Sequence, residues 1–168
     1  MVENGDVAPD FTIPMVAPGD RADRVGEYTG EDVHPFTLSD ALEEGPVVLA
    51  FFPGAFSRTC TTEMCEFRDW LAEIGDLEGQ VYGVSADMPW ALLAYINEYD
   101  LNFPLLSGFN SDVIADYGVR RDDGLLAGIA NRSVFVVGRD RTVRYKWLVE
   151  EPGVLPDLEA IRTALADA

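Results

Sequence analysis

The segment PVVLAFF, residues 46 to 52, limits most strongly what this chain can fold into. It is a continuous apolar run of strand length, with Gly45 before it and Pro53 and Gly54 after it. A strand with two apolar faces is typical of the inside of a parallel sheet, where other elements cover both faces. The segment therefore predicts a layered protein with a buried strand at its centre.

The segments that follow alternate between helical and strand patterns. Residues 61 to 74 carry apolar side chains at helical spacing and are followed by Gly75, which predicts a helix that stops there. QVYGVS, residues 80 to 85, has the composition of a second strand. Residues 89 to 100 begin with Pro89 at a permitted helix start and carry an apolar face, which predicts a second helix.

The remainder of the chain completes an α/β pattern. After a loop over residues 101 to 131, two strand-like runs flank the turn GRDR, which predicts a hairpin over residues 132 to 149. Residues 156 to 168 have the pattern of a short amphipathic helix. We therefore expect one α/β domain over residues 1 to 168, with a mixed central sheet flanked by helices. Residues 17 to 35, polar and rich in Gly and Pro, predict a surface excursion without chemistry.

The charge balance excludes several functions. The chain has 30 acidic against 12 basic residues and a formal net charge of −18, and Lys146 is its single lysine. Such a surface repels phosphate backbones and anionic lipids, so we expect no nucleic-acid or membrane partner. Self-repulsion of this size destabilises the compact state in dilute buffer and is screened by molar salt. The composition is typical of proteins from halophilic archaea, although an acidic mesophilic protein remains an alternative.

The amino terminus and the few thiols indicate a reducing compartment. MVENGDVAPDF lacks the basic start and apolar middle of a signal peptide, which predicts a cytoplasmic protein. A structural disulfide is uncommon there, so reactive or metal-binding thiols are the better interpretation. With two cysteines and His34 as the single histidine, the chain has too few ligands for a structural zinc site. We expect His34 to be solvated or capping rather than catalytic.

Both cysteines lie in FFPGAFSRTCTTEMC, residues 51 to 65. Cys60 comes where the buried strand has ended and the helix begins, and the free N–H groups and dipole of a helix start favour an anion. A thiolate is therefore favoured over a thiol. A helix terminus contributes about 1 kcal/mol, so a second cation or several hydrogen bonds are also needed. The alternative is that Cys60 is a small buried apolar residue.

These residues resemble a known family. PGAFSRTC, residues 53 to 60, is similar to the peroxiredoxin active-site pattern Pro-x-x-x-Thr/Ser-x-x-Cys. The longer stretch FFPGAFSRTCTTEMCEFRD resembles the AhpC/TSA branch that includes bacterioferritin-comigratory and AhpE-like proteins, and VAPDFTIP, VVLAFFP, VYGVSAD and RSVFVV extend the similarity. The resemblance implies a thioredoxin-like fold and a thiol-dependent peroxidase that reduces hydrogen peroxide and organic hydroperoxides.

The resemblance also implies a role for individual residues. Cys60 matches the peroxidatic thiolate, which attacks the peroxide and becomes a sulfenic acid. Ser57 takes the place of the hydroxyl that hydrogen-bonds peroxide and thiolate, and Pro53 that of the residue closing one wall of the pocket. Arg132 matches the arginine that stabilises the thiolate and the charge developing across the O–O bond. Glu63 matches a glutamate that bonds within the active-site loop.

The residues themselves support some of these assignments and leave others open. Arg132 leads into an apolar strand and is costly to bury without a partner, which a thiolate would supply, although a surface ion pair is the alternative. Arg120, Arg121, Arg139 and Arg141 stand in loop-like contexts and are poorer candidates. Ser57 also fits a turn or capping hydroxyl. Helix caps are plausible at Thr59 and Thr61, and Glu63 fits an acidic first turn.

Cys65 follows Cys60 at a spacing that resembles the subgroup whose resolving cysteine lies five residues after the peroxidatic one. On an ideal helix, residues five apart have Cα atoms about 8.7 Å apart, beyond the roughly 7 Å limit for a disulfide. A bridge therefore requires the helix start to unwind, after which a thioredoxin-like dithiol would reduce it. The alternative is that Cys65 packs in the core of a one-cysteine enzyme, which an external small thiol would recycle.

Two further functions compete with the peroxidase. Thioredoxin-type disulfide oxidoreductases use Cys-x2-Cys, and the spacing here is Cys-x4-Cys. A non-enzymatic peroxide sensor would use the same sulfenic chemistry as a switch. The resemblance implies no organic or metal cofactor, because thiols supply the electrons. It also implies a monomer or a homodimer.

Overall fold

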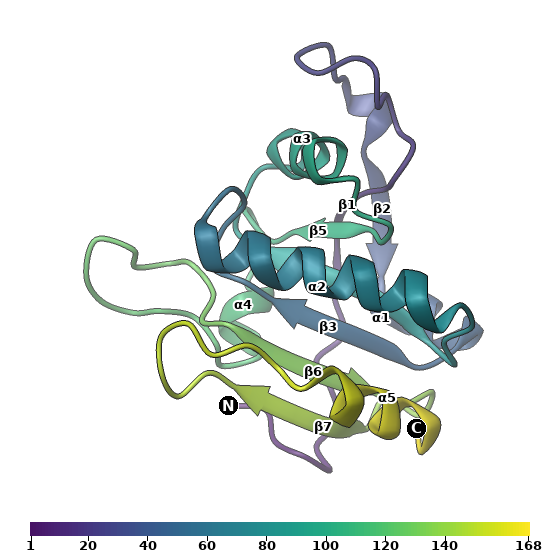
Figure 1. Ribbon diagram of the computed structural model, residues 1–168. Coiled ribbons are helices and arrows are strands. Elements are labelled where there is room, and N and C mark those ends of the chain that lie inside the picture. The colour runs from purple at the N-terminus through teal and green to yellow at the C-terminus, as the bar shows by residue number, and fades with distance from the viewer.

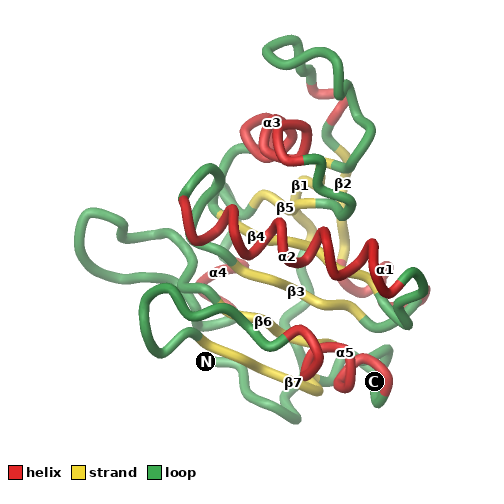
Figure 2. Tube along the Cα trace, in the orientation of Figure 1, coloured by secondary structure: helices red, strands yellow, loops and turns green.

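All seven strands belong to one mixed sheet in a computed structural model that describes residues 1 to 168 (Figures 1 and 2). The strand order is β2-β1-β5-β4-β3-β6-β7, with β3, β4 and β5 parallel and the other pairs antiparallel. This confirms the predicted α/β class. The strands are β1 Thr12–Val16, β2 His34–Thr37, β3 Val47–Phe51, β4 Gln80–Ser85, β5 Leu105–Ser107, β6 Ser133–Val137 and β7 Val143–Leu148.

The strand β3 is the centre of the molecule, as its sequence predicted. All five of its residues are buried, and it pairs with β4 on one side and β6 on the other. Its side chains alternate between two hydrophobic clusters, one on each face of the sheet. Leu49 and Phe51 belong to one cluster, and Val48 and Ala50 to the other.

Helices cover both faces of this sheet. The cluster that contains Val48 also contains side chains of α2, α3 and α5, which lie in front of the sheet in Figure 1. The cluster that contains Leu49 includes side chains of α1 and α4. The helices are α1 Leu38–Glu44, α2 Arg58–Ile74, α3 Pro89–Tyr99, α4 Val113–Asp116 and α5 Leu158–Ala166, and η1 Gly30–Asp32 is a short 3-10 turn.

Most of the predicted elements are confirmed. The helix α2 ends before Gly75, whose φ of 70° suits glycine, and α3 has Pro89 in its first turn. The hairpin of β6 and β7 and the terminal helix α5 are also present. The prediction of a plain loop over residues 101 to 131 is wrong, because this segment contains β5 and α4. Elements of three and four residues are too short to show a periodic pattern.

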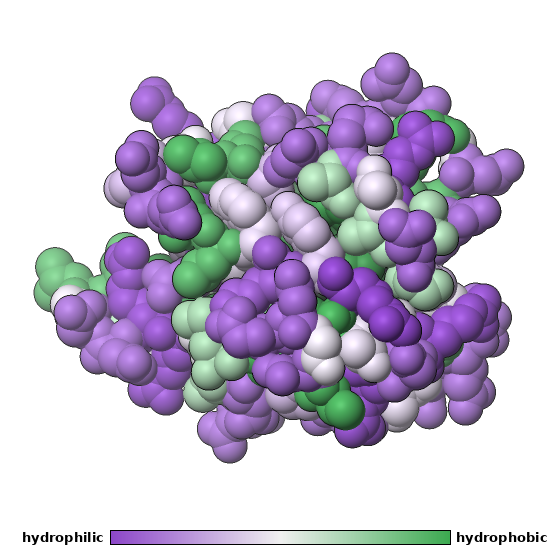
Figure 3. All heavy atoms as spheres, turned by 90° about the horizontal axis from the view of Figure 1, so that it is seen from below, coloured by the Kyte–Doolittle hydropathy of each residue, from purple (hydrophilic) through white to green (hydrophobic).

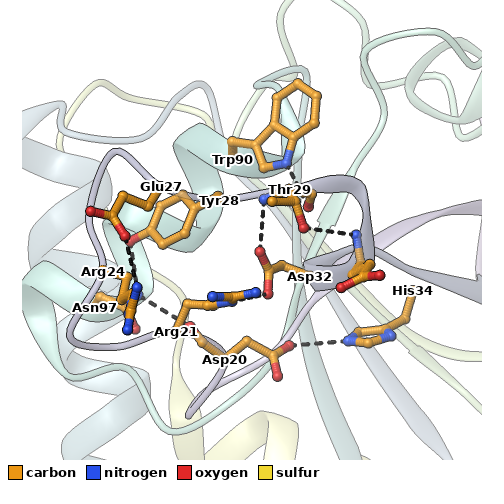
Figure 4. Close-up of polar contacts among 11 residues, drawn as sticks. Asp20, Arg21, Arg24, Glu27, Tyr28, Thr29, Asp32, His34, Trp90 and Asn97 are labelled. Carbon is orange, nitrogen blue, oxygen red and sulfur yellow. Dashed lines mark hydrogen bonds and ion pairs between the residues drawn. The ribbon is translucent and has the colours of Figure 1, made fainter.

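The predicted surface excursion packs against α3 (Figure 4). The indole nitrogen of Trp90 donates to the carbonyl oxygen of Thr29 at 3.1 Å, and the Asn97 amide donates to the Tyr28 hydroxyl at 2.9 Å. His34 is exposed and lies 3.1 Å from Asp20, which agrees with the expected solvated role. These contacts hold the excursion against α3.

The surface carries far more carboxylates than cations, and Figure 3 shows a largely hydrophilic face. No helix has both the length and the apolar character that crossing a membrane requires. With 30 acidic and 12 basic residues, most carboxylates have no cation to pair with, so repulsion among them opposes folding in dilute buffer.

We expect thermal stability to rise steeply between about 0.1 M and 3 M KCl, because the Debye length falls from about 10 Å to below about 3 Å. Differential scanning fluorimetry across this range measures the effect. A melting temperature that stays constant or falls with salt would contradict the halophilic interpretation.

Candidate active site

Cys60 lies at the start of α2, which follows β3 after the loop of residues 52 to 57. Ser57 is the residue before the helix, so Cys60 is in its first turn, where backbone N–H groups have no intrahelical partner. The cysteine is 1% exposed and belongs to the hydrophobic cluster under α2. The helix start favours a negative charge on its sulfur, whereas the apolar surroundings oppose it, so a nearby cation is required.

That cation is Arg132, and strand register places it there. β3 and β6 are antiparallel with Phe51 opposite Ser133, so the residue just before β6 lies beside the end of β3. The buried Arg132 guanidinium donates through Nη2 to Cys60 Sγ, 3.5 Å away. The two residues are 72 positions apart in the sequence, and only the sheet brings them together.

Glu63 completes a buried triad with these two residues. Its Oε2 accepts a hydrogen bond from Arg132 Nη1, and its Oε1 is buried with no hydrogen-bond partner. The prediction that Glu63 occupies the first turn is wrong: α2 begins at Arg58, so Glu63 lies in the second turn and points inward, 1% exposed. Arg132 is therefore shared between the carboxylate and the sulfur.

Burial dominates the titration of Glu63. It raises the pKa of Glu63 from 4.5 to about 7, and the charge and hydrogen bond of Arg132 only partly offset this. For Arg132, burial lowers the pKa, but Glu63 and Cys60 outweigh it and the pKa lies above its usual value. The arginine therefore stays charged while Glu63 changes its charge near neutral pH.

We expect this carboxyl group to make stability depend on pH. The unfolded carboxyl releases its proton near pH 4.5 and the folded one near pH 7, so its contribution is complete below about pH 4.5 and is lost as pH rises to about 7. The loss amounts to about 3 kcal/mol. Urea unfolding of wild type and Glu63→Gln at pH 4.5, 6 and 7.5 measures it, because the variant lacks this slope.

The control is Glu73→Gln, which removes an exposed carboxylate from the same helix. It should keep the slope of the wild type. Equal pH slopes in wild type and Glu63→Gln would show that the buried carboxyl has an ordinary affinity for protons.

A cleft of about 350 Å³ opens beside this triad. Its lining combines residues around the start of α2, Arg132 before β6, and the segment after β7. The lining residues are Pro53, Thr59, Arg121, Asn131, Arg132, Val149, Glu150, Glu151, Pro152 and Gly153. Pro53 and Arg132 both line the cleft, so a small molecule in it would approach the Arg132 guanidinium.

Ser57, Thr59 and Thr61, which the sequence suggested as a peroxide-binding hydroxyl or as helix caps, do not have these positions in the structure. Ser57 is exposed, its side chain makes no capping hydrogen bond, and it is not part of the cleft. The predictions of helix caps at Thr59 and Thr61 are wrong, because α2 begins at Arg58. Thr59 lines the cleft instead, and Thr61 accepts a hydrogen bond from Tyr95.

Cys65 lies further along α2, which is helical throughout Arg58–Ile74. It is partly buried, and both cysteines are free thiols. The helix is unbroken between Cys60 and Cys65, so the two thiols stay on separate parts of α2. The contact that the structure does form is the one between Cys60 and Arg132. A bridge between the two thiols requires a different conformation of this segment.

Comparison with known proteins identifies the family of this chain. Residues 4 to 146 match the model of the AhpC/TSA family. The chain belongs to this family. It is 30% identical over 168 residues to alkyl hydroperoxide reductase E of Mycobacterium bovis, covering 99% of this chain and 97% of the relative. Bovine peroxiredoxin-2 is 31% identical over 170 residues, covering 96% and 77%.

Solved structures of AhpC/TSA proteins share the fold. The peroxidoxin BcpB of Mycobacterium tuberculosis has a TM-score of 0.74 at 31% identity, covering 99% of this chain and 96% of that one. The AhpC of the same organism has a TM-score of 0.81 at 23% identity, covering 99% and 92%, and supports the fold alone. The expected thioredoxin-like fold is confirmed, and the chain is a thiol-dependent peroxidase.

Some residues that shape this AhpC/TSA site were not found from the sequence. Asp87, after β4, accepts hydrogen bonds at Oδ2 from the Ala55 backbone at 2.8 Å and from the Ser85 hydroxyl at 2.7 Å. It thereby fixes the turn between Pro53 and α2. The available signal was the acid at the end of VYGVSAD, which marks a strand end near the active-site loop. Arg121 was set aside as a loop residue, yet it lines the cleft.

Proposed function

We propose that Cys60 is the peroxidatic residue of this peroxidase. Its thiolate attacks one oxygen of a hydroperoxide, the O–O bond breaks, and the sulfur becomes a sulfenic acid. The departing oxygen takes up a proton and leaves as water or an alcohol. The observation that carries the proposal is the 3.5 Å contact between Arg132 Nη2 and Cys60 Sγ at a helix start. One fixed charge can stabilise the thiolate and then the departing oxygen.

The remaining site residues have supporting roles in this proposal. Glu63 holds Arg132 in position through the second guanidinium nitrogen. Pro53 and Thr59 form the side of the cleft that the peroxide passes. Ser57 lies one helical turn before Cys60, and its hydroxyl must turn inward from its exposed position before it can hydrogen-bond the peroxide.

We propose further that Cys65 resolves the sulfenic acid. The Cys65 thiol attacks the Cys60 sulfur, a disulfide forms, and the sulfenic oxygen leaves as water. The start of α2 must first unwind, so the cycle alternates between a folded and a locally unfolded segment. A thioredoxin-like dithiol then reduces the disulfide. The setting that we propose is cytoplasmic, with the enzyme working as a monomer or homodimer and without a nucleic-acid or membrane partner.

Intact mass spectrometry tests the role of Cys65. Reduced protein is treated with one equivalent of hydrogen peroxide and examined without reductant. We expect a loss of two hydrogens in wild type, and a gain of one or more oxygens in Cys65→Ser. An oxygen gain in wild type as well would exclude resolution by Cys65 and favour a one-cysteine enzyme that an external thiol recycles.

Turnover separates the peroxidase from the two competing functions. A catalytic amount of protein should consume many equivalents of peroxide with dithiothreitol as reductant. A peroxide sensor would react once and then recover slowly, and a thioredoxin-type catalyst would reduce insulin disulfides instead. The relatives' names include peroxiredoxin and alkyl hydroperoxide reductase, which supports hydrogen peroxide and organic hydroperoxides as the first substrates to compare.

A further inference from the structure

Tyr95 contacts the active-site segment but has no part in the chemistry above. It comes from α3, is fully buried, and donates its hydroxyl hydrogen to Thr61 Oγ1 at 3.0 Å. Thr61 is the residue after Cys60 and lies in the part of α2 that must unwind. The hydrogen bond therefore joins a fixed helix to the segment that has to move.

Tyr95 also holds the loop on the other side of Cys60. Its ring packs edge-on against Phe56, with ring centroids 5.0 Å apart and an interplanar angle of 82°. Phe56 has a φ of 66°, a conformation that costs free energy for an aromatic residue and persists only where surrounding contacts compensate. Tyr99 lies 6.2 Å from the Phe56 ring and completes this support. One tyrosine thus contacts residues before and after the reactive cysteine.

We propose that Tyr95 is a positioning residue that keeps the first turns of α2 folded and thereby sets the fate of the Cys60 sulfenic acid. This inference rests on the proposed resolution by Cys65. While the segment is folded, the sulfenic acid stays away from Cys65 and can react with a second hydroperoxide, which oxidises it to a sulfinic acid and leaves as water or an alcohol. When the segment opens, Cys65 condenses with the sulfenic acid and releases water.

The hydrogen bond between Tyr95 and Thr61 exists only in the folded form, so it stabilises that form. It therefore favours oxidation to the sulfinic acid over formation of the disulfide. The Tyr95–Thr61 hydrogen bond is partly buried, and a hydrogen bond of this kind changes an opening equilibrium by roughly five-fold. Removing the Tyr95 hydroxyl should therefore raise the open population and favour the disulfide over the sulfinic acid by about the same factor.

Tyr95→Phe and Thr61→Val each remove the bond from one side, and the double variant tests whether they act as a pair. Tyr117→Phe is the matched control: its buried hydroxyl donates to the Pro9 carbonyl at 2.9 Å, and its ring belongs to the cluster on the opposite face of the sheet. Mass spectrometry after graded peroxide gives the ratio of disulfide to sulfinic acid. Hydrogen–deuterium exchange of reduced protein gives the opening of residues 58 to 66.

We expect a roughly five-fold higher ratio and faster exchange in residues 58 to 66 for both single variants, no further gain in the double variant, and wild-type values for Tyr117→Phe. Unchanged exchange in Tyr95→Phe, or equal acceleration in Tyr117→Phe, would overturn the role of Tyr95. A third outcome is faster exchange in the variants while neither wild type nor variants form a disulfide. It would support the role of Tyr95 in holding α2. It would overturn both the effect of Tyr95 on the sulfenic acid and the proposed resolution by Cys65.

Discussion

Cys60→Ser is expected to lower peroxide consumption by at least about a thousand-fold while the protein stays folded. Serine is close to cysteine in size and can accept the hydrogen bond from Arg132, so the buried site loses little packing. Its hydroxyl is not ionised near neutral pH and is a far weaker nucleophile toward peroxide. Stopped-flow measurement of peroxide loss, together with circular dichroism of the variant, checks both parts of this expectation.

Cys65→Ser is the matched control, because it makes the same substitution at the other cysteine of α2 and leaves the contact between Arg132 and Cys60 in place. It should consume one equivalent of peroxide at the wild-type rate and then be impaired in recycling. If Cys60→Ser kept its first turnover while Cys65→Ser lost it, the peroxidatic role would belong to Cys65, and the contact between Arg132 and Cys60 would have no catalytic meaning.

Arg132→Met is expected to slow the reaction with peroxide by roughly a hundred-fold and to destabilise the fold. The guanidinium is the charge that contacts Cys60, and it is also the partner of the buried Glu63. In wild type at pH 8, above the Glu63 pKa of about 7, the carboxyl is ionised and paired with Arg132. Removing Arg132 removes the charge and the hydrogen bond that lower this pKa, so the buried carboxyl must take up a proton or stay unpaired, which costs up to about 3 to 5 kcal/mol. At pH 5.5 the carboxyl is protonated, so the cost should be smaller.

The double variant Arg132→Met/Glu63→Gln separates the two roles of the arginine. Removing the carboxylate should restore most of the stability at pH 8, because no buried charge remains unpaired. The reaction with peroxide should stay slow, because the cation beside the sulfur is still missing. Recovery of the rate along with the stability would mean that Arg132 acts only by supporting the fold. Urea unfolding and single-turnover kinetics on the same samples distinguish these outcomes.

The sequence was informative where a physical signal is local. The apolar run before Pro53 predicted β3 because a strand buried on both faces needs no polar positions, and β3 is buried along its whole length. Apolar side chains at helical spacing predicted α2, α3 and α5, because a helix that packs on a sheet buries one face. The short elements β5 and α4 were not predicted, because three or four residues carry too little periodicity and are held by their neighbours.

The sequence by itself determined the fold class and indicated Cys60 as the candidate reactive cysteine and Arg132 as its candidate partner. A thiol after a buried strand, at a helix start, needs a cation, and Arg132 was the candidate that led into an apolar strand. The tertiary structure alone decided how close they come, because the register of β3 against β6 spans 72 positions of sequence. It also decided that Glu63 points inward, that Ser57 is exposed and that Tyr95 reaches Thr61. Local patterns follow from short-range backbone geometry, whereas these contacts depend on how distant elements pack.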